Sequence, residues 1–226
     1  MAGRALTENL YPLTSFELGK QFNLEDVLAT GALPEAVLAT SSEERKAYLR
    51  SYALNYLKNE IQSEQWVRRL DPFRKFLQIA SQMNGRVLNY SNIATDVGVE
   101  PATIQSYFDI LEDTLVGMRL TSFHRSVRKQ QRKAPKFYFF DLGVKRALDR
   151  TLEIPLKIST SAYDEAFEHF VIMEIFRLSQ YKKKDYELSY LLTKDGVEID
   201  LIIDRPNQPV VLIEIKSKTH ADRRDT

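Results

Sequence analysis

The stretch GVEIDLII at residues 196–203, followed by VVLIEIK at residues 210–216, determines the fold predicted for the C-terminal part of this chain. Both stretches are rich in β-branched and aliphatic residues, and the segment DRPNQP between them supplies turn residues, so two neighbouring strands are expected. Another strand-like run at 186–192 and a largely apolar helix at 163–181 precede them. A helix followed by three strands predicts an α/β or α+β layer.

Acidic and basic side chains lie on these predicted strands. Glu214 and Lys216 are two residues apart and therefore project on the same side of their strand. Asp200 lies on the preceding strand beside Glu198, so Asp200, Glu214 and Lys216 can converge at one end of the sheet. Paired carboxylates are the oxygen ligands that Mg²⁺ takes, and the metal would activate water and offset charge on a phosphodiester. A neighbouring lysine would stabilise the developing charge.

Glu168 is a further candidate for this site. Its helical neighbours at i+4 and i+7 are Ile172 and Ile175, so the carboxylate occupies an otherwise apolar face and needs a partner. A metal ion is one such partner. The alternative is structural: Asp200 and Lys216 would form a cross-strand ion pair, and Glu168 would meet Lys216 or a helix end.

Residues 86–140 have the element order of a winged helix-turn-helix. The motif begins with a short helix around Ile93, a turn at Gly98 and a second helix opened by Pro101. Two strand-like runs follow, at 116–123 and 136–140. Upstream, Ser41 and Glu44 predict the start of one amphipathic helix, and Asp71-Pro72 the start of the next.

The loop between the two strand-like runs is basic. No Asp or Glu occurs between residues 114 and 140, and the same stretch holds seven cations. Non-specific contact with the DNA backbone is predicted for five of them, because each neutralised phosphate releases counterions: Arg125, Arg128, Lys129, Arg132 and Lys133. The alternative is a solvated hairpin tip. The presumed recognition helix at 101–115 has no Lys or Arg and carries three acids, which argues against sequence-specific readout.

The amino-acid composition excludes several classes of protein and of functional site. The 226 residues carry a formal net charge of +1, contain no Cys and only three scattered His. Disulfides and thiolate zinc sites are thereby excluded. Neither a signal peptide nor an apolar run long enough to span a bilayer is found, so a cytoplasmic protein with no membrane partner is expected.

The C-terminal residues resemble a known nuclease core. Glu198–Ile203 followed by Ile213–Lys218 is similar to the PD-(D/E)XK nuclease core, and Phe167–Val171 resembles the helix that supplies its additional Glu. This resemblance implies that Asp200 and Glu214 are Mg²⁺ ligands, that Glu168 is an additional ligand, and that Lys216 is the phosphate or water partner.

A wider resemblance covers residues 1–218, which are similar to the C-terminal half of an archaeal-type AAA ATPase family. Ala2-Gly3-Arg4 and Leu10–Thr14 resemble the closing strands of an ATPase module, and Gly31–Pro34 resembles the motif that follows it. No GxxxxGK[ST] motif is present, so no ATP binding through a P-loop is expected. The resemblance implies an ATPase module upstream or in trans, with this chain starting late or trimmed.

Together these observations predict an α+β protein with N-terminal helices and a winged helix-turn-helix before a nuclease-like α/β domain. The nuclease-like core normally continues beyond its ExK strand, so this one is expected to be incomplete. The expected parts are an arm at 1–22, a helical linker at 23–70, the winged helix at 71–145 and the nuclease-like domain at 146–226. Three functions stay open: a DNA-associated module of an AAA-type ATPase with Mg²⁺-dependent phosphodiester hydrolysis, a non-catalytic interaction or regulatory module with a degenerate nuclease fold, and a winged-helix transcription regulator. Whether the chain forms an oligomer also stays open.

Overall fold

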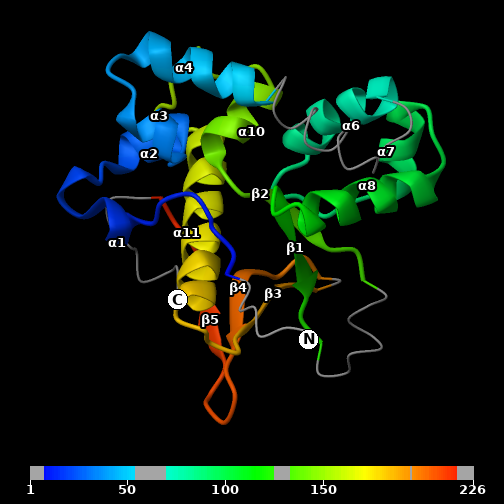
Figure 1. The fold of residues 1–226 in the computed structure, drawn as a ribbon. Helices are drawn as coiled ribbons and strands as arrows, with labels where there is room; N and C mark the ends of the chain where they lie inside the picture. Colours follow the sequence, from blue (N-terminus) through cyan, green and yellow to red (C-terminus); the bar gives the residue numbers. More distant parts are fainter. Residues whose placement is uncertain (1–7, 54–69, 125–132, 194, 218–226) are drawn as a thin grey trace, which may run out of the picture.

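The computed structural model describes residues 8–53, 70–124, 133–193 and 195–217. The protein is α+β, as predicted, with helices around one five-stranded sheet that has parallel and antiparallel pairs. The long helix α11 (Ser161–Tyr181) runs beside this sheet (Figure 1). The N-terminal helices lie on one side of α11, and the helices of residues 70–113 lie on the other.

The predicted arm at 1–22 differs from the structure over residues 15–21, which are helical. They form α1 (Ser15–Leu18) and the 3-10 turn η1 (Gly19–Gln21). Thr14 caps α1 through a capping box: its hydroxyl accepts the N–H of Glu17, and the Glu17 carboxylate accepts the N–H of Thr14 at 2.9 Å. This reciprocal pair satisfies two backbone donors and starts a helix where little helical periodicity exists.

The next three helices are short and are also started by local signals. Ser41 accepts the N–H of Glu44, as expected from the sequence, while the Glu44 carboxylate bonds to Thr40. These helices are α2 (Leu24–Thr30), α3 (Pro34–Leu38) and α4 (Ser42–Ser51).

The segment from Gly31 to Pro34 docks onto the start of helix α10 (Leu142–Leu148). Asp141 accepts the N–H of Val144 as the cap of α10 and also the N–H of Ala32 at 2.7 Å. Gly31 has φ 71°, and a Cβ there would lie 2.1 Å from an Asp141 carboxylate oxygen. Only glycine fits this contact, which joins the N-terminal helices to the rest of the molecule.

The helices and the hairpin of the winged helix-turn-helix are present in the predicted order. Asn89 caps the first helix of the motif, and Gly98 turns the chain at φ 84°. The elements are α6 (Leu70–Gln82), α7 (Tyr90–Val97), α8 (Pro101–Asp113), β1 (Gly117–Ser122) and β2 (Lys136–Phe139).

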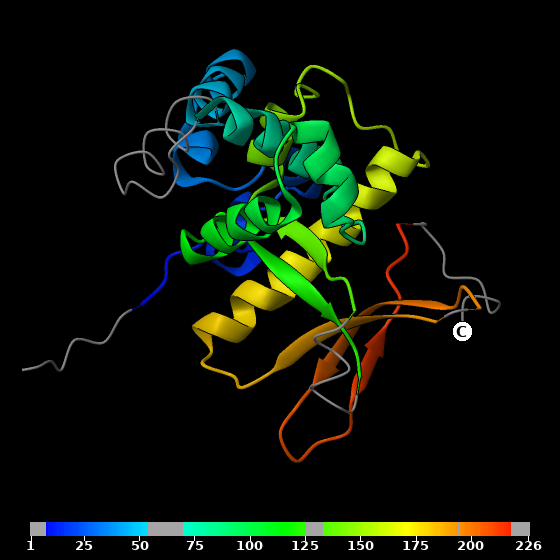
Figure 2. The same ribbon diagram turned by 90° about the vertical axis from the view of Figure 1, so that its right-hand side faces the viewer.

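The sheet crosses the predicted boundary between the winged helix and the C-terminal domain. Its strand order is β2-β1-β3-β4-β5, with β1 parallel to β3 through the pairs Thr121–Ser189 and Ser122–Tyr190. Figure 2 shows β1 running from the helices of the winged motif to the C-terminal strands. The predicted division at 145/146 also falls inside α10. The remaining strands are β3 (Glu187–Leu192), β4 (Glu198–Asp204) and β5 (Val211–Ile213).

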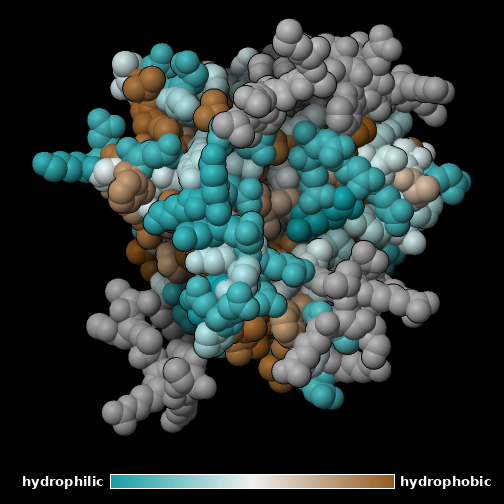
Figure 3. Space-filling model, turned by 60° about the horizontal axis from the view of Figure 1, so that its bottom comes forward, coloured by the Kyte–Doolittle hydropathy of each residue, from teal (hydrophilic) through white to brown (hydrophobic). Residues whose placement is uncertain are grey.

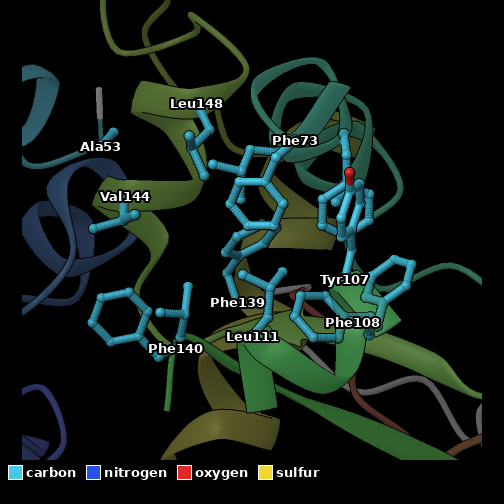
Figure 4. Close-up of a cluster of buried hydrophobic side chains, with 14 of the residues drawn as sticks. Ala53, Phe73, Tyr107, Phe108, Leu111, Phe139, Phe140, Val144 and Leu148 are labelled. Atoms are coloured by element: carbon cyan, nitrogen blue, oxygen red, sulfur yellow. The ribbon is translucent and has the colours of Figure 1, made fainter. Parts of the chain in front are cut away.

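Aromatic packing fixes the winged motif onto its hairpin (Figure 4). The ring of Phe108 in α8 packs edge to face against the ring of Phe76 in α6, with 4.9 Å between the ring centroids. The centroid of the Phe137 ring in β2 also lies 4.9 Å from that of Phe108. Burying each such ring contributes about 1.5–3 kcal/mol. A second hydrophobic cluster lies between α11 and the strands, and the candidate site forms at its border.

Candidate functional site

A buried lysine on β2 is the centre of the candidate site. The Lys136 ammonium lies 2.6 Å from a carboxylate oxygen of Glu198 and 3.5 Å from one of Glu168, and its side chain is only 6% exposed. The ring of Tyr190 lies 5.4 Å from the same nitrogen. The site therefore joins the wing hairpin, helix α11 and strand β4 through one cation.

Tyr138, two residues along β2, completes the grouping. Its hydroxyl donates to Glu168 at 2.6 Å, and its side chain is fully buried. Burial and the charge of Glu168 raise the pKa of Tyr138 well above its ordinary value, so at neutral pH it is a hydrogen-bond donor.

The charges of this grouping act on one another. Burial lowers the pKa of Lys136, but attraction to Glu168, Glu198 and Asp200 outweighs burial and raises that pKa. Burial raises the pKa of Glu168, and repulsion from Asp200 and Glu198 adds to the increase against the effects of Lys136 and Tyr138. Asp200 thus belongs electrostatically to the cluster of Glu168 and Glu198, and these three are called the carboxylate cluster below.

Glu214 and Lys216 make a separate pair. The Lys216 ammonium lies 2.6 Å from a Glu214 oxygen, with both side chains more than 40% exposed. The two side chains share one side of the chain, as predicted from their spacing. Asp200 instead accepts the N–H of Ile215 at 2.7 Å. The structure therefore places Glu168 and Glu198 against Lys136, with Asp200 near enough to influence their charges, while Glu214 and Lys216 form an ion pair with each other.

The Mg²⁺ expected here must compete with a lysine. Glu168 and Glu198 contact the Lys136 ammonium, which already supplies the positive charge that a metal would supply. Across the described ranges, no three His, Cys, Asp or Glu side chains are placed to share one metal ion. As arranged, the carboxylate cluster fits a lysine side chain, and metal binding by Glu168, Asp200 and Glu214 stays a prediction.

The basic loop can be followed only at its ends. Arg125, Arg128, Lys129 and Arg132 lie outside the described residues, and Lys133 is exposed. Two other cations of the same acid-free stretch form internal ion pairs, Lys136 in the site above and Arg119 with two acids of α8. The Arg119 guanidinium lies 2.6 Å from Asp109 and also pairs with Glu112.

Sequence reasoning missed the central roles of Lys136 and Tyr138. Their signal is weak: Lys136 is the only charged residue in the β2 sequence KFYF, and it shares a strand face with Tyr138. Glu198 was noticed only as a neighbour of Asp200.

His169, beside Glu168, has a structural role. One ring nitrogen lies 2.7 Å from the Phe139 carbonyl, and the other lies 3.0 Å from the Asn84 amide nitrogen. Asn84 in turn accepts the N–H of Phe139. Burial lowers the pKa of His169 to about 3, so the ring is neutral and ties α11 to β2.

Two family models match consecutive parts of the chain, which meet near residue 162. Residues 163–226 match Domain of unknown function (DUF4143), a domain that occurs in AAA-ATPase-associated proteins. Residues 21–161 match Domain of unknown function (DUF8612), and the chain belongs to that family.

Two curated relatives are each 25% identical to this chain over 213 residues. They are Uncharacterized protein Rv2008c of Mycobacterium tuberculosis and Uncharacterized protein Mb2031c of Mycobacterium bovis. The match covers 92% of this chain and 46% of each relative, so the chain spans about half the length of the curated relatives it matches. No solved structure matches the chain.

The described helices include none with the length and apolar character needed to cross a bilayer. On the face drawn in Figure 3, hydrophilic residues predominate among the coloured atoms, and hydrophobic side chains gather in small areas.

Proposed function

We propose that this chain is a DNA-associated module of an AAA-type ATPase and that its winged helix contacts the DNA backbone without sequence preference. The observation that carries the proposal is the antiparallel pairing of β1 with β2, two strands that a basic stretch of sequence without Asp or Glu connects. Arg119 and Lys136 are neutralised internally, so the proposal assigns phosphate contact to the other five cations of this stretch.

The acids of helix α8 support backbone contact rather than base readout. Asp109 and Glu112 bind Arg119, and only Gln105 and Ser106 are exposed polar side chains near the start of this helix. Base-specific contacts normally need Arg, Lys, Asn or Gln in the groove. The ATPase module itself would be supplied upstream or in trans, since this chain spans 46% of each curated relative.

Fluorescence anisotropy with two unrelated DNA duplexes across a salt series tests this proposal. Similar affinities are expected for both, with log K falling by about 0.9 per phosphate contact for each tenfold rise in salt. Alanine at Arg125, Arg128, Lys129, Arg132 and Lys133 together should abolish binding. The control variant replaces the exposed residues Lys182, Lys183 and Lys184 with alanine and should keep most of the DNA affinity. A strong preference for one sequence would instead favour a transcription regulator.

For the C-terminal part we propose a connecting role rather than catalysis. Lys136 occupies the centre of the carboxylate cluster and links it to the wing, so the nuclease-like core serves to position the hairpin. The second candidate function is Mg²⁺-dependent phosphodiester hydrolysis, favoured by the convergence of Glu168 and Asp200.

Titration calorimetry with Mg²⁺ and Mn²⁺, together with plasmid cleavage, separates these two candidates. The connecting role predicts no saturable binding and no cleavage. Saturable binding abolished by Asp200→Ala, with cleavage lost in Glu214→Ala, would establish the nuclease instead. Cleavage that is equal in the wild type and Glu214→Ala would indicate contamination rather than this site.

A further inference from the structure

A cavity of about 590 Å³ lies between α4, α6 and α10, away from the carboxylate cluster. Its floor is apolar and includes Phe73 and Leu77 of α6, Leu148 of α10, and Leu152. Ala53, Phe73 and Leu148 lie along the upper side of the hydrophobic cluster in Figure 4. Cavities of this size and lining hold small organic ligands in many proteins.

The rim of the cavity is positively charged. Among the residues that the structure describes, four cations and one acid, Glu153, line it. Glu153 pairs with Arg50 and with Lys46, and Arg74 pairs with Asp71 at 3.2 Å. Lys75 and Arg150 are exposed, and neither forms an ion pair with any residue that the structure describes. Within the described part of the chain, two cations without an acidic partner therefore lie at the rim above an apolar floor.

Arg150 reaches this rim through an unusual backbone conformation. It follows α10 with φ 61°, a left-handed position that helices usually fill with glycine or asparagine. Its N–H donates to the Ala147 carbonyl at 3.3 Å, which closes the helix end. Glycine would make the same turn without the steric cost of a Cβ, so the arginine at this position is not explained by the turn alone.

We propose that this cavity binds a small amphipathic anion, with its ring or chain against Phe73 and the leucines and its anionic head between Lys75 and Arg150. The cations of the rim attract the anionic head of the ligand, and the apolar floor packs against its uncharged part. Nucleoside phosphates and fatty acids share this chemistry. Each presents an apolar part and one charged end, and the competition arms below distinguish them.

The test is a fluorescence titration of the full chain with 8-anilinonaphthalene-1-sulfonate, which has an aromatic body and one sulfonate. Saturable binding at one site is expected, and it should weaken with added salt. Arg150→Gly and Lys75→Ala should each weaken the affinity about 5- to 10-fold, because each removes a charge–charge contact. Displacement by AMP or by laurate identifies which source of anion the site prefers.

The design separates binding from folding. Arg150→Gly removes the steric cost of the turn, so its Tm should equal or exceed that of the wild type while its affinity falls. Lys183 is the matched control: it also follows a helix with positive φ, at 47°, but does not line this cavity. Lys183→Gly should leave the affinity unchanged. Equal affinity in Arg150→Gly, Lys75→Ala and the wild type, or dye binding that never saturates, would overturn the proposal.

Discussion

Two groupings of lysine with carboxylates occur in the C-terminal half of this protein, and their geometry differs. Lys136 is buried and contacts acids from two other elements, helix α11 and strand β4. Lys216 is exposed and pairs with Glu214, two residues away on the same segment. The first grouping joins parts of the chain that are distant in sequence, whereas the ion pair of the second joins residues two positions apart.

This difference shows that the type and spacing of residues do not determine what a lysine–acid pair does. Exposed pairs gain little, because water screens their attraction and both side chains lose freedom. A buried pair is costly to disturb, because removing one partner leaves the other charge without compensation. The motif-like pair Glu214 and Lys216 is therefore expected to matter less for the fold than Lys136, which no motif marks.

Low pH should have the largest effect on the free energy of unfolding. The share of this effect that comes from His169 has to be known before the two lysine groupings are compared at different pH values. The pKa of His169 is lowered from 6.5 to about 3, so the folded ring resists protonation. Stability from this residue is complete above pH 6.5 and is lost as the pH falls toward 3. At about 1.4 kcal/mol per tenfold difference in proton affinity, the loss reaches about 5 kcal/mol. Urea unfolding against pH measures it, and His169→Gln should remove this part of the pH dependence. An unchanged profile in His169→Gln would assign the acid sensitivity elsewhere.

The next effect compares the two lysines directly. Lys136→Met should lower the free energy of unfolding by about 3 kcal/mol, because Glu168 and Glu198 lose their cation. Lys216→Met should change it by about 0.5 kcal/mol or less. Chemical denaturation of the two variants measures both values. Equal losses would show that burial does not distinguish the groupings.

Tyr138→Phe sharpens the comparison within the buried grouping. The hydroxyl donates to Glu168 at 2.6 Å, so its removal should cost about 1.5–3 kcal/mol, as for other hydrogen bonds to charged groups. In a Glu168→Gln background the cost should fall, because the acceptor is neutral. A double-mutant cycle isolates this coupling, and a cost that is the same in both backgrounds would contradict the assigned partner.

The smallest effect concerns the exposed pair. A double-mutant cycle on Glu214 and Lys216 should give a coupling of about 0.5 kcal/mol, which disappears in about 0.5 M salt. The coupling between Lys136 and Glu168 should persist at the same salt concentration. Loss of both couplings in salt would mean that the buried grouping is open to water.

Local signals allowed most helices and strands to be predicted. Pro101, Gly98 and the period of the apolar residues located helices α7 and α8, and branched residues located the strands. The misassigned part, residues 15–21, carried the signal Thr14 and Glu17 but lacked helical periodicity. The pairing of β1 with β3 joins residues almost 70 positions apart, and no local pattern specifies such a contact.

The candidate site was predicted in part because strand alternation holds only where the register is regular. Ser189 pairs with Ile202, but Leu191 pairs with Ile199, so β4 carries an extra residue in this region. Such a bulge changes which side chains share a face. The sequence predicts that Asp200 converges with Glu214 and Lys216 and that Glu168 joins them, and this convergence stays a prediction. Lys136 arrives from β2, through a sheet pairing that sequence reasoning had placed in another domain.

The bond between Phe123 and Tyr190 has a consequence for how this chain can be divided. The two matched families meet near residue 162, yet the backbone N–H of Phe123 donates to the Tyr190 carbonyl at 2.6 Å across that division. A fragment ending at residue 161 would leave β1 with an open edge and an unshielded row of amides and carbonyls. Sequence similarity thus separates two families where backbone hydrogen bonds make a single cooperative unit.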